Sequence, residues 1–140
     1  MTGGTGFVGR AVLARLVARN DLRVLAWIRR ADAVLPAGAV PVALSHNRMF
    51  AAGAEVEELH TVVHCAARVH VMDDDASDSL AEFRRANVEL TLDLARSAAA
   101  LGARRFILIS TIKVNGEATR PGQPFTAFDT PQPCGAYQRQ

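Results

Sequence analysis

The chain has 140 residues, of which 49% are hydrophobic and 21% are charged. A chain of this length can bury a hydrophobic core without disulfides or a metal, and this composition excludes a disordered protein. Sixteen basic and fourteen acidic residues leave a net charge of +2. That charge, with no basic cluster interleaved with aromatic residues, argues against nucleic-acid binding.

The cellular compartment is indicated by three further features. No apolar run approaches the roughly 18 residues of a membrane span. The start Met-Thr-Gly-Gly does not have the character of a secretion signal. Cys65 and Cys134 form no CxxC pair and suit a reducing compartment. We therefore expect a cytoplasmic protein that does not interact with a membrane.

Short apolar runs alternate with helical patterns along the chain. Strand character covers residues 22–28, 40–44, 61–66 and 105–110. Two stripes at helical spacing comprise Val8, Val12, Leu13, Leu16 and Val17, and Leu80, Phe83, Leu90, Leu94 and Leu101. The second stripe predicts a helix of about twenty residues, capped by Asp78 or Ser79 and stopped by Gly102. This alternation predicts an α/β fold with a doubly wound parallel sheet, covered on both faces.

Residues 2–9 read TGGTGFVG, a TGxxGxxG pattern. The pattern assigns Gly3 to a tight turn, Gly6 to the close approach of a phosphate, and Gly9 to the packing of the helix on the sheet. An amphipathic helix and then a strand follow, which is the context that dinucleotide binding requires. The alternative is a glycine-rich N-terminal tail. The predicted cofactor-binding positions here are Gly3, Gly6, Phe7, Val8 and Gly9.

A buried strand usually precedes such a pattern, whereas only Met1 precedes Thr2. That strand is central in a doubly wound sheet. The loss of about four or five buried apolar residues would remove roughly 5–10 kcal/mol of burial. We therefore expect a nearly absent first strand in a chain truncated at its start.

The end of the second strand bears on the choice of cofactor. Sites for NAD usually place an acidic residue there, but Ile28 or Arg29 stands at that position, followed by Arg30, and no carboxylate is available. Two guanidinium groups favour the 2′-phosphate of NADP over NAD. Alternatively, both arginines are solvated charges at a strand end.

Three further segments join the glycine pattern: Val63-His64-Cys65-Ala66-Ala67, Asn87-Val88, and Ile109-Ser110-Thr111 leading to Val114-Asn115-Gly116. Together the four motifs resemble the extended short-chain dehydrogenase/reductase family, the NAD-dependent epimerase/dehydratases of nucleotide sugars, over essentially the whole chain. Residues 62–72, 80–106 and 110–133 look most like the UDP-glucose 4-epimerase-like subgroup, which includes 4-keto reductases of O-antigen sugar synthesis. The resemblance implies that residues 1–140 form one incomplete NAD(P)-binding Rossmann domain, without the C-terminal substrate domain.

The resemblance also implies a catalytic site. In the family, a Ser or Thr, a Tyr, and a Lys four residues after the Tyr transfer hydride and proton at C4 of the sugar. Thr111 matches the first position, with Ser110 beside it, and Tyr137 matches the second. A phenol pKa of about 10 must fall for this chemistry at neutral pH, and the lysine ammonium and nicotinamide ring supply that change.

Two functions stay open because the lysine would directly follow Gln140, and the residues after Tyr137 depart from the family's Tyr-Gly-x-Ser-Lys pattern. One is an NAD(P)-dependent oxidoreductase or epimerase whose partner is a UDP-sugar substrate. The other is a non-catalytic dinucleotide-binding module or an inactive fragment.

Asn87 lies on the apolar stripe of its helix, where a buried amide must be hydrogen-bonded. It is predicted either to tie the helix to neighbouring backbone or, as in the family, to support the cofactor. In the family, Ala66 and Ala67 let the cofactor approach the backbone. His64 is predicted as a buried, hydrogen-bonded strand residue rather than a proton donor.

The histidines show no ligand spacing with a nearby cysteine or carboxylate, so no metal site is expected. In the family, dimers form through the helix that contains Asn87 and the helix that starts at the catalytic Tyr. A homodimer is therefore an expectation of the resemblance.

Overall fold

The computed structural model describes residues 1–43, 59–69 and 79–134. The chain divides into two compact units. The first contains Met1–Ala67 and Leu90–Ile109, and the second contains Arg68–Glu89 and Ser110–Gln140.

The strands of the first unit form two parallel pairs. They are β1 (Val24–Ile28), β2 (Ala39–Ala43), β3 (Thr61–His64) and β4 (Arg105–Leu108). β1 pairs with β2 and β3 pairs with β4, in registers that align Val24 with Ala39 and Thr61 with Arg105. The four predicted strands are therefore present. β1, β3 and β4 are shorter than their predicted runs, whereas β2 has the predicted length and begins one residue earlier.

Met1 and Thr2 join the two pairs of strands. Met1 donates its amino group to the Leu25 carbonyl and accepts from the Trp27 amide, which is parallel pairing along β1. On the other side, Thr2 donates to the Val63 carbonyl and accepts from the Cys65 amide. Two residues thus occupy the central position between β1 and β3, which confirms the expectation of a nearly absent first strand in a doubly wound sheet.

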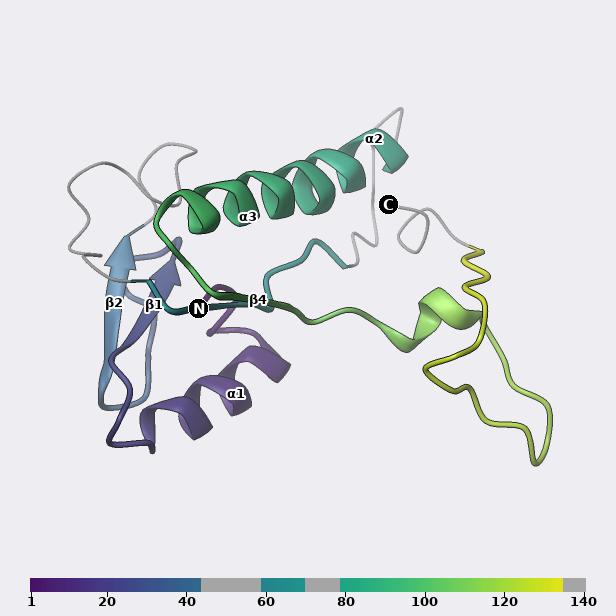
Figure 1. Ribbon diagram of the computed structural model, residues 1–140, viewed down its shortest axis with the longest axis horizontal. Helices are drawn as coiled ribbons and strands as arrows, with labels where there is room; N and C mark the ends of the chain where they lie inside the picture. The colour runs from purple at the N-terminus through teal and green to yellow at the C-terminus, as the bar shows by residue number, and fades with distance from the viewer. Residues whose placement is uncertain (44–58, 70–78, 135–140) are drawn as a thin grey trace. The chain divides into compact units, whose positions relative to one another are not determined.

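Helices pack on both faces of these strands (Figure 1). α1 (Phe7–Val17) places Leu13, which is fully buried, in a core with Met1, Val24, Ala26 and Val63. α3 (Leu90–Ala100) places Leu94 and Ala98 against Val62, with Phe106 beside them. Because Val62 and Val63 are neighbours in β3 and project to opposite faces, the two cores lie on opposite faces of the sheet.

The predicted long helix has a change of geometry inside it. α2 (Ser79–Phe83) leads into the π-helix η1 (Arg84–Glu89) and then into α3. The helix ends before Gly102, whose φ is +78°, as the sequence predicts. A π-turn bonds i to i+5 and shifts the angular phase of all later residues. The predicted stripe is wrong at Leu90 and Leu101, which are partly exposed, whereas Leu94 is buried. Leu101 lies beyond the end of α3.

Burial was also predicted too widely elsewhere. Val8 is 49% exposed because it lies at the open N-terminal end of α1. Ile107 and Leu108 of β4 are about half exposed, and α3 packs on the β4 face that carries Phe106. Among the described residues, helices therefore cover both faces of β3 but only one face of β4. No helix in the described ranges is both long and apolar enough to cross a membrane.

Candidate functional site

The glycine loop forms a tight turn between Thr2 and α1. Gly3 has a φ of +69° and its carbonyl accepts the Gly6 amide at 3.0 Å. The Gly6 carbonyl then accepts the Arg10 amide at 2.8 Å, which starts the helix. A side chain other than glycine rarely adopts the backbone conformation of Gly3, so this position requires the residue that the motif supplies.

The glycines of the loop have different surroundings. A Cβ at Gly3 would lie 2.5 Å from the Ala66 nitrogen, and one at Gly9 would lie 2.0 Å from the Gly3 carbonyl oxygen. A Cβ at Gly6 would meet only that same oxygen, at 3.4 Å. Gly3 and Gly9 are therefore required by contacts within the protein, whereas Gly6 is exposed and faces open space. The sequence predicts that Gly9 packs the helix on the sheet, whereas the nearest contacts of Gly9 are with Gly3 and Gly4 of the loop itself.

Gly4 is a packing residue that the motif passes over. It is buried, and a Cβ there would lie 2.9 Å from a methyl group of Leu13. In the sequence, Gly4 occupies a position that the TGxxGxxG motif leaves open, so the motif does not predict its buried packing role.

The end of β3 contains a buried polar group. His64 is 1% exposed; its Nδ1 lies 2.5 Å from the Thr2 hydroxyl and its Nε2 lies 2.9 Å from the Thr91 hydroxyl of α3. Desolvation, and then the nearby N-terminal ammonium group, lower the pKa of His64, so the ring is neutral at pH 7. The prediction of a buried, hydrogen-bonded histidine is confirmed.

The segment that follows His64 lies against the glycine loop. The Ala66 amide points to the Thr2 hydroxyl at 3.4 Å, and the contact with Gly3 leaves no space for a side chain between them. Ala66 is half-buried and Ala67 is exposed. The structure thus brings Ala66 together with the loop from a position more than sixty residues along the chain.

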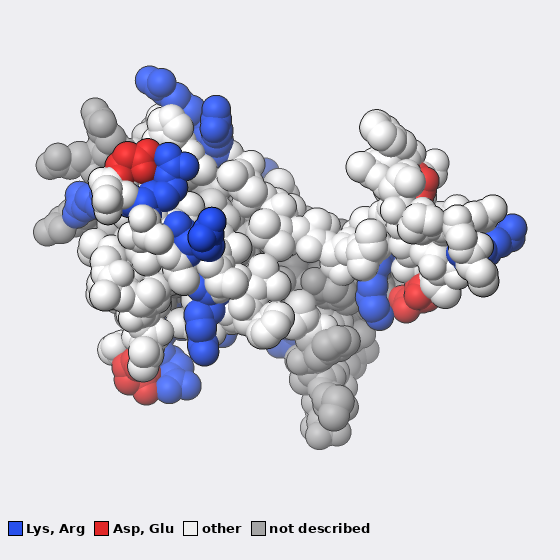
Figure 2. Space-filling model, turned by 90° about the horizontal axis from the view of Figure 1, so that it is seen from below, with Lys and Arg blue, Asp and Glu red and all other residues white. Residues whose placement is uncertain are grey.

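The turn after β1 contains an acidic residue that the sequence reasoning overlooked. Arg30 forms a two-pronged contact with Asp32, with nitrogen–oxygen distances of 3.0 and 2.7 Å. The statement that no carboxylate is available here is therefore wrong, because the turn after Ile28 places Asp32 beside Arg30. No described residue pairs with Arg29. Figure 2 shows basic side chains in separate groups on one face, some of them adjoining acidic groups.

In the second unit, Asn87 binds the backbone of Arg68 in both directions. Its Oδ1 accepts the Arg68 amide at 2.7 Å, and its Nδ2 donates to the Arg68 carbonyl at 3.0 Å. The guanidinium of Arg68 lies over the ring of Phe83, 5.9 Å from its centre. Asn87 therefore ties its helix to neighbouring backbone, which is the first of the two predicted roles. The second role, support of the cofactor, stays a prediction.

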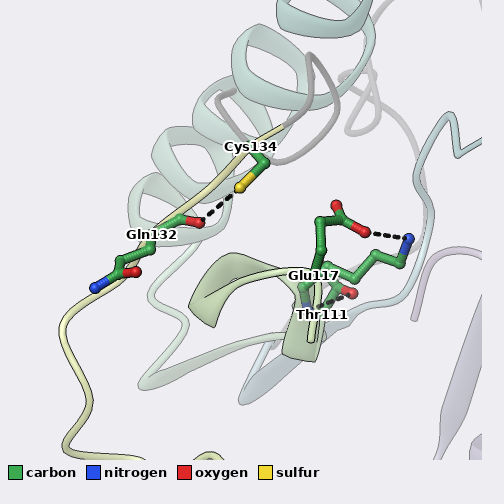
Figure 3. Close-up of polar contacts among 5 residues, drawn as sticks. Thr111, Glu117, Gln132 and Cys134 are labelled. Atoms are coloured by element: carbon green, nitrogen blue, oxygen red, sulfur yellow. Dashed lines mark hydrogen bonds and ion pairs between the residues drawn. The ribbon is translucent and has the colours of Figure 1, made fainter. Parts of the chain in front are cut away.

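Thr111 begins the short helix η2 (Ile112–Asn115). Its hydroxyl accepts the Lys113 amide at 3.3 Å and retains its own proton for donation. The Lys113 ammonium pairs with Glu117 at 3.3 Å, and the segment with Gln132 and Cys134 runs nearby (Figure 3). The Gln132 amide donates to the Val114 carbonyl at 2.8 Å.

Ser110, next to Thr111, is exposed. Tyr137 lies outside the described residues, so its catalytic role stays a prediction. Ser110 and Thr111 belong to one unit and the glycine loop to the other.

The glycine loop fits the diphosphate of a dinucleotide. The first turn of a helix leaves amide N–H groups without partners inside the helix, and an anion is stabilised there. No side chain caps α1, no acidic residue stands in its first turn, and the cap residue Gly6 leaves open space beside it. With parallel strands and helices on both faces, these features define a Rossmann-type α/β fold.

The chain belongs to the NAD dependent epimerase/dehydratase family, whose model matches residues 1–140. It is 38% identical over 142 residues to a UDP-glucose 4-epimerase from Vibrio cholerae, covering 98% of this chain and 42% of that relative. The resemblance stated from the motifs is therefore confirmed.

Solved structures show the same fold. A short-chain dehydrogenase/reductase superfamily protein from Agrobacterium tumefaciens with bound NAD superposes with a TM-score of 0.73 at 26% identity, over 99% of this chain and 40% of that one. UDP-glucuronic acid 4-epimerase from Bacillus cereus with NAD gives a TM-score of 0.75 at 16% identity, over 99% and 47% of the two chains. The chain spans less than half the length of each of these relatives.

Proposed function

We propose that this protein is an NAD(P)-dependent oxidoreductase or epimerase that acts at C4 of a UDP-sugar, in the synthesis of polysaccharide or O-antigen sugars. Residues 1–140 form the incomplete NAD(P)-binding domain of such an enzyme, which is cytoplasmic and homodimeric. The observation that carries the proposal is the glycine loop, in which Gly3 and Gly9 are closed by backbone contacts while Gly6 faces open space. The similarity to a UDP-glucose 4-epimerase supports the substrate class.

In this proposal the cofactor is held by Gly3, Gly6, Phe7, Val8 and Gly9, with Ala66, Ala67 and Asn87 contributing further along the dinucleotide. When bound, its nicotinamide ring supplies a reversible acceptor for a hydride. Thr111 donates or accepts a hydrogen bond at the C4 oxygen, with Ser110 beside it. Tyr137 takes the proton of the C4 hydroxyl as the carbonyl forms, and returns it on reduction.

The proposal predicts that the full-length protein interconverts UDP-glucose and UDP-galactose in the presence of NAD or NADP. Replacing the general acid–base group in Tyr137→Phe lowers kcat by about 10²–10⁴-fold. Thr111→Val lowers it less, because only a hydrogen bond to the substrate is lost. Chromatography of the nucleotide sugars after timed incubation measures both rates.

Thr119→Val is the matched control, because Thr119 is an exposed threonine of the same unit and its replacement leaves the rate unchanged. Reduction of a UDP-4-keto sugar by NADPH, without interconversion, would assign the reductase branch of the proposal. Tight NADH binding without turnover of either sugar class would instead favour a non-catalytic dinucleotide-binding module.

We further propose that NADP is preferred over NAD, with Arg29 as the residue that pairs with the 2′-phosphate. Arg30 is held by Asp32, so its charge is partly neutralised. Arg29→Gln is expected to weaken NADPH binding by roughly tenfold, the usual value of one hydrogen bond to a charged group, and to leave NADH binding unchanged. Asp32→Asn strengthens NADPH binding, because it frees Arg30 and removes a negative charge.

A second exposed pair provides the control for this test. Arg19 binds Asp21 with the same two-pronged geometry, at 2.9 and 2.6 Å, but at the amino end of β1, away from the carboxyl ends of the strands. Asp21→Asn therefore leaves the ratio of NADPH to NADH affinity unchanged in isothermal titration. An equal change of that ratio in Asp21→Asn and Asp32→Asn would contradict a local role for Asp32.

A further inference from the structure

His64 is joined by side-chain hydrogen bonds to two elements besides its own strand. Nδ1 bonds the Thr2 hydroxyl at 2.5 Å and Nε2 bonds the Thr91 hydroxyl at 2.9 Å. Phe106 packs on the ring, with the two ring centres 6.1 Å apart. The imidazole thus connects the central strand, β3 and α3, while being only 1% exposed.

A neutral imidazole has one N–H donor and one acceptor nitrogen. One threonine hydroxyl therefore donates to the ring and the other accepts from it, whichever tautomer is present. Both ring nitrogens are paired in this way, and a buried polar atom that loses its partner is costly. These two bonds consequently hold the ring in a single orientation.

The bond to Thr2 acts next to the glycine turn. Thr2 immediately precedes Gly3, and the Thr2 hydroxyl also lies 3.4 Å from the Ala66 amide. The Gly3 backbone contacts Ala66 so closely that a Cβ would come within 2.5 Å of its nitrogen. The position of Thr2 therefore determines how the loop and the Ala66 segment are spaced.

We propose that His64 is a positioning residue of the dinucleotide site, which through its bond to the Thr2 hydroxyl sets the spacing between the glycine loop and the Ala66 segment. It touches no cofactor atom itself, and its bond to Thr91 only anchors the ring. This proposal rests on the proposed function, because it assumes that the loop binds a dinucleotide.

The two sides of the ring can be separated by substitution. An asparagine amide reaches the position of Nδ1, and a glutamine amide reaches that of Nε2. His64→Asn therefore retains the bond to Thr2, whereas His64→Gln retains the bond to Thr91. Thr2→Val and Thr91→Val each remove one hydroxyl without a change of shape, and Thr2→Ser restores the hydroxyl next to the loop.

The affinity for NADH is measured in the full-length protein by the change in NADH fluorescence on binding, with the melting temperature recorded for every variant. Loss of one hydrogen bond is expected to lower the affinity by up to roughly tenfold, and this loss is expected for His64→Gln and Thr2→Val. His64→Asn, Thr91→Val and Thr2→Ser keep the affinity of the unmodified protein, although the first two lower the melting temperature.

A purely structural role would make the affinity follow the melting temperature in all variants, and equal losses in Thr2→Val and Thr91→Val would overturn the proposal. If His64→Gln does not fold, the two valine variants decide the question alone. Failure of the unmodified protein to bind either NADH or NADPH would overturn the proposed function, and the positioning role with it.

Discussion

Gly9→Ala is expected to destabilise the first unit by about 2–3 kcal/mol or more and to abolish nucleotide binding. The new Cβ would lie 2.0 Å from the carbonyl oxygen and 2.7 Å from the carbonyl carbon of Gly3. Both are backbone atoms in a tight turn, so no side chain can yield. Overpacking typically costs about 1–3 kcal/mol and occasionally more, and a contact this short with backbone atoms lies at or above the upper end of that range. The gain in helix propensity returns at most about 1 kcal/mol, which leaves about 2–3 kcal/mol or more. Denaturant unfolding measures the change.

The damage arises because α1 has to move away from the loop. Leu13 follows Gly9 by four residues in the same helix. It is fully buried and packs in the core with Met1 and Val24. A shift of the helix opens that core and also separates the first amide groups of α1 from Gly6. Stability and binding are therefore lost together.

Two other glycines serve as controls. Gly102→Ala, where φ is +78° and nothing lies within 4 Å of a new Cβ, isolates the backbone cost of about 1–2 kcal/mol. Gly6→Ala, where φ is −77° and the nearest atom lies at 3.4 Å, leaves stability nearly unchanged but weakens NADH binding, since its Cβ fills the open space. A Gly9→Ala protein as stable as Gly102→Ala would contradict the packing argument.

The 140-residue chain with a free N-terminus is expected to lose roughly 3 kcal/mol of stability between pH 8 and pH 5, out of about 4 kcal/mol over the whole titration. The Met1 amino group lies between β1 and β3, donates to the Leu25 carbonyl at 2.6 Å, and belongs to a residue only 6% exposed. Burial lowers the pKa of this group from its usual 8.0 to about 5. Each unit of pKa is worth about 1.4 kcal/mol, which gives the expected size.

The direction follows from proton binding. The folded chain binds the proton more weakly than the unfolded chain, so protonation favours unfolding. Stability is therefore full above the unfolded pKa of 8.0, falls as the pH decreases toward about 5, and is lowest below it. Urea unfolding at a series of pH values gives the profile.

N-terminal acetylation supplies the control for this prediction. An acetylated Met1 retains an N–H that donates to Leu25, but it has no charge to bury. Burial lowers the pKa of His64 in both chains, and the charged amine lowers it further only in the chain that is not acetylated, so the difference between the two profiles reports the amine together with its effect on His64. Parallel profiles from pH 8 to pH 5 would contradict the prediction.

Much of the fold could be predicted because its signals are local. The apolar runs that became β1 and β3, the stop of the long helix at Gly102, and the turn at Gly3 depend on side chains and backbone angles within a few residues. The relation to the epimerase/dehydratase family followed from motifs of the same short range.

The prediction failed where a local pattern was changed by geometry. The π-helix η1 interrupts the α-helical spacing of the apolar stripe between Phe83 and Leu90, and Leu90 is partly exposed. The prediction considered a carboxylate only at the strand end itself, and Asp32 lies four residues beyond Ile28. The turn after β1 places the Asp32 carboxylate next to the Arg30 guanidinium.

The sequence by itself determined that the chain is a parallel α/β protein with a glycine turn before its first helix, because periodicity and glycine spacing report the local backbone. Only the tertiary structure decided that Met1 and Thr2 join the two strand pairs, and that His64 binds Thr2 and Thr91. The hydrogen-bonded side chains of Thr2 and His64 stand 62 residues apart. No local pattern specifies such a pairing, since it exists only once the strands have met.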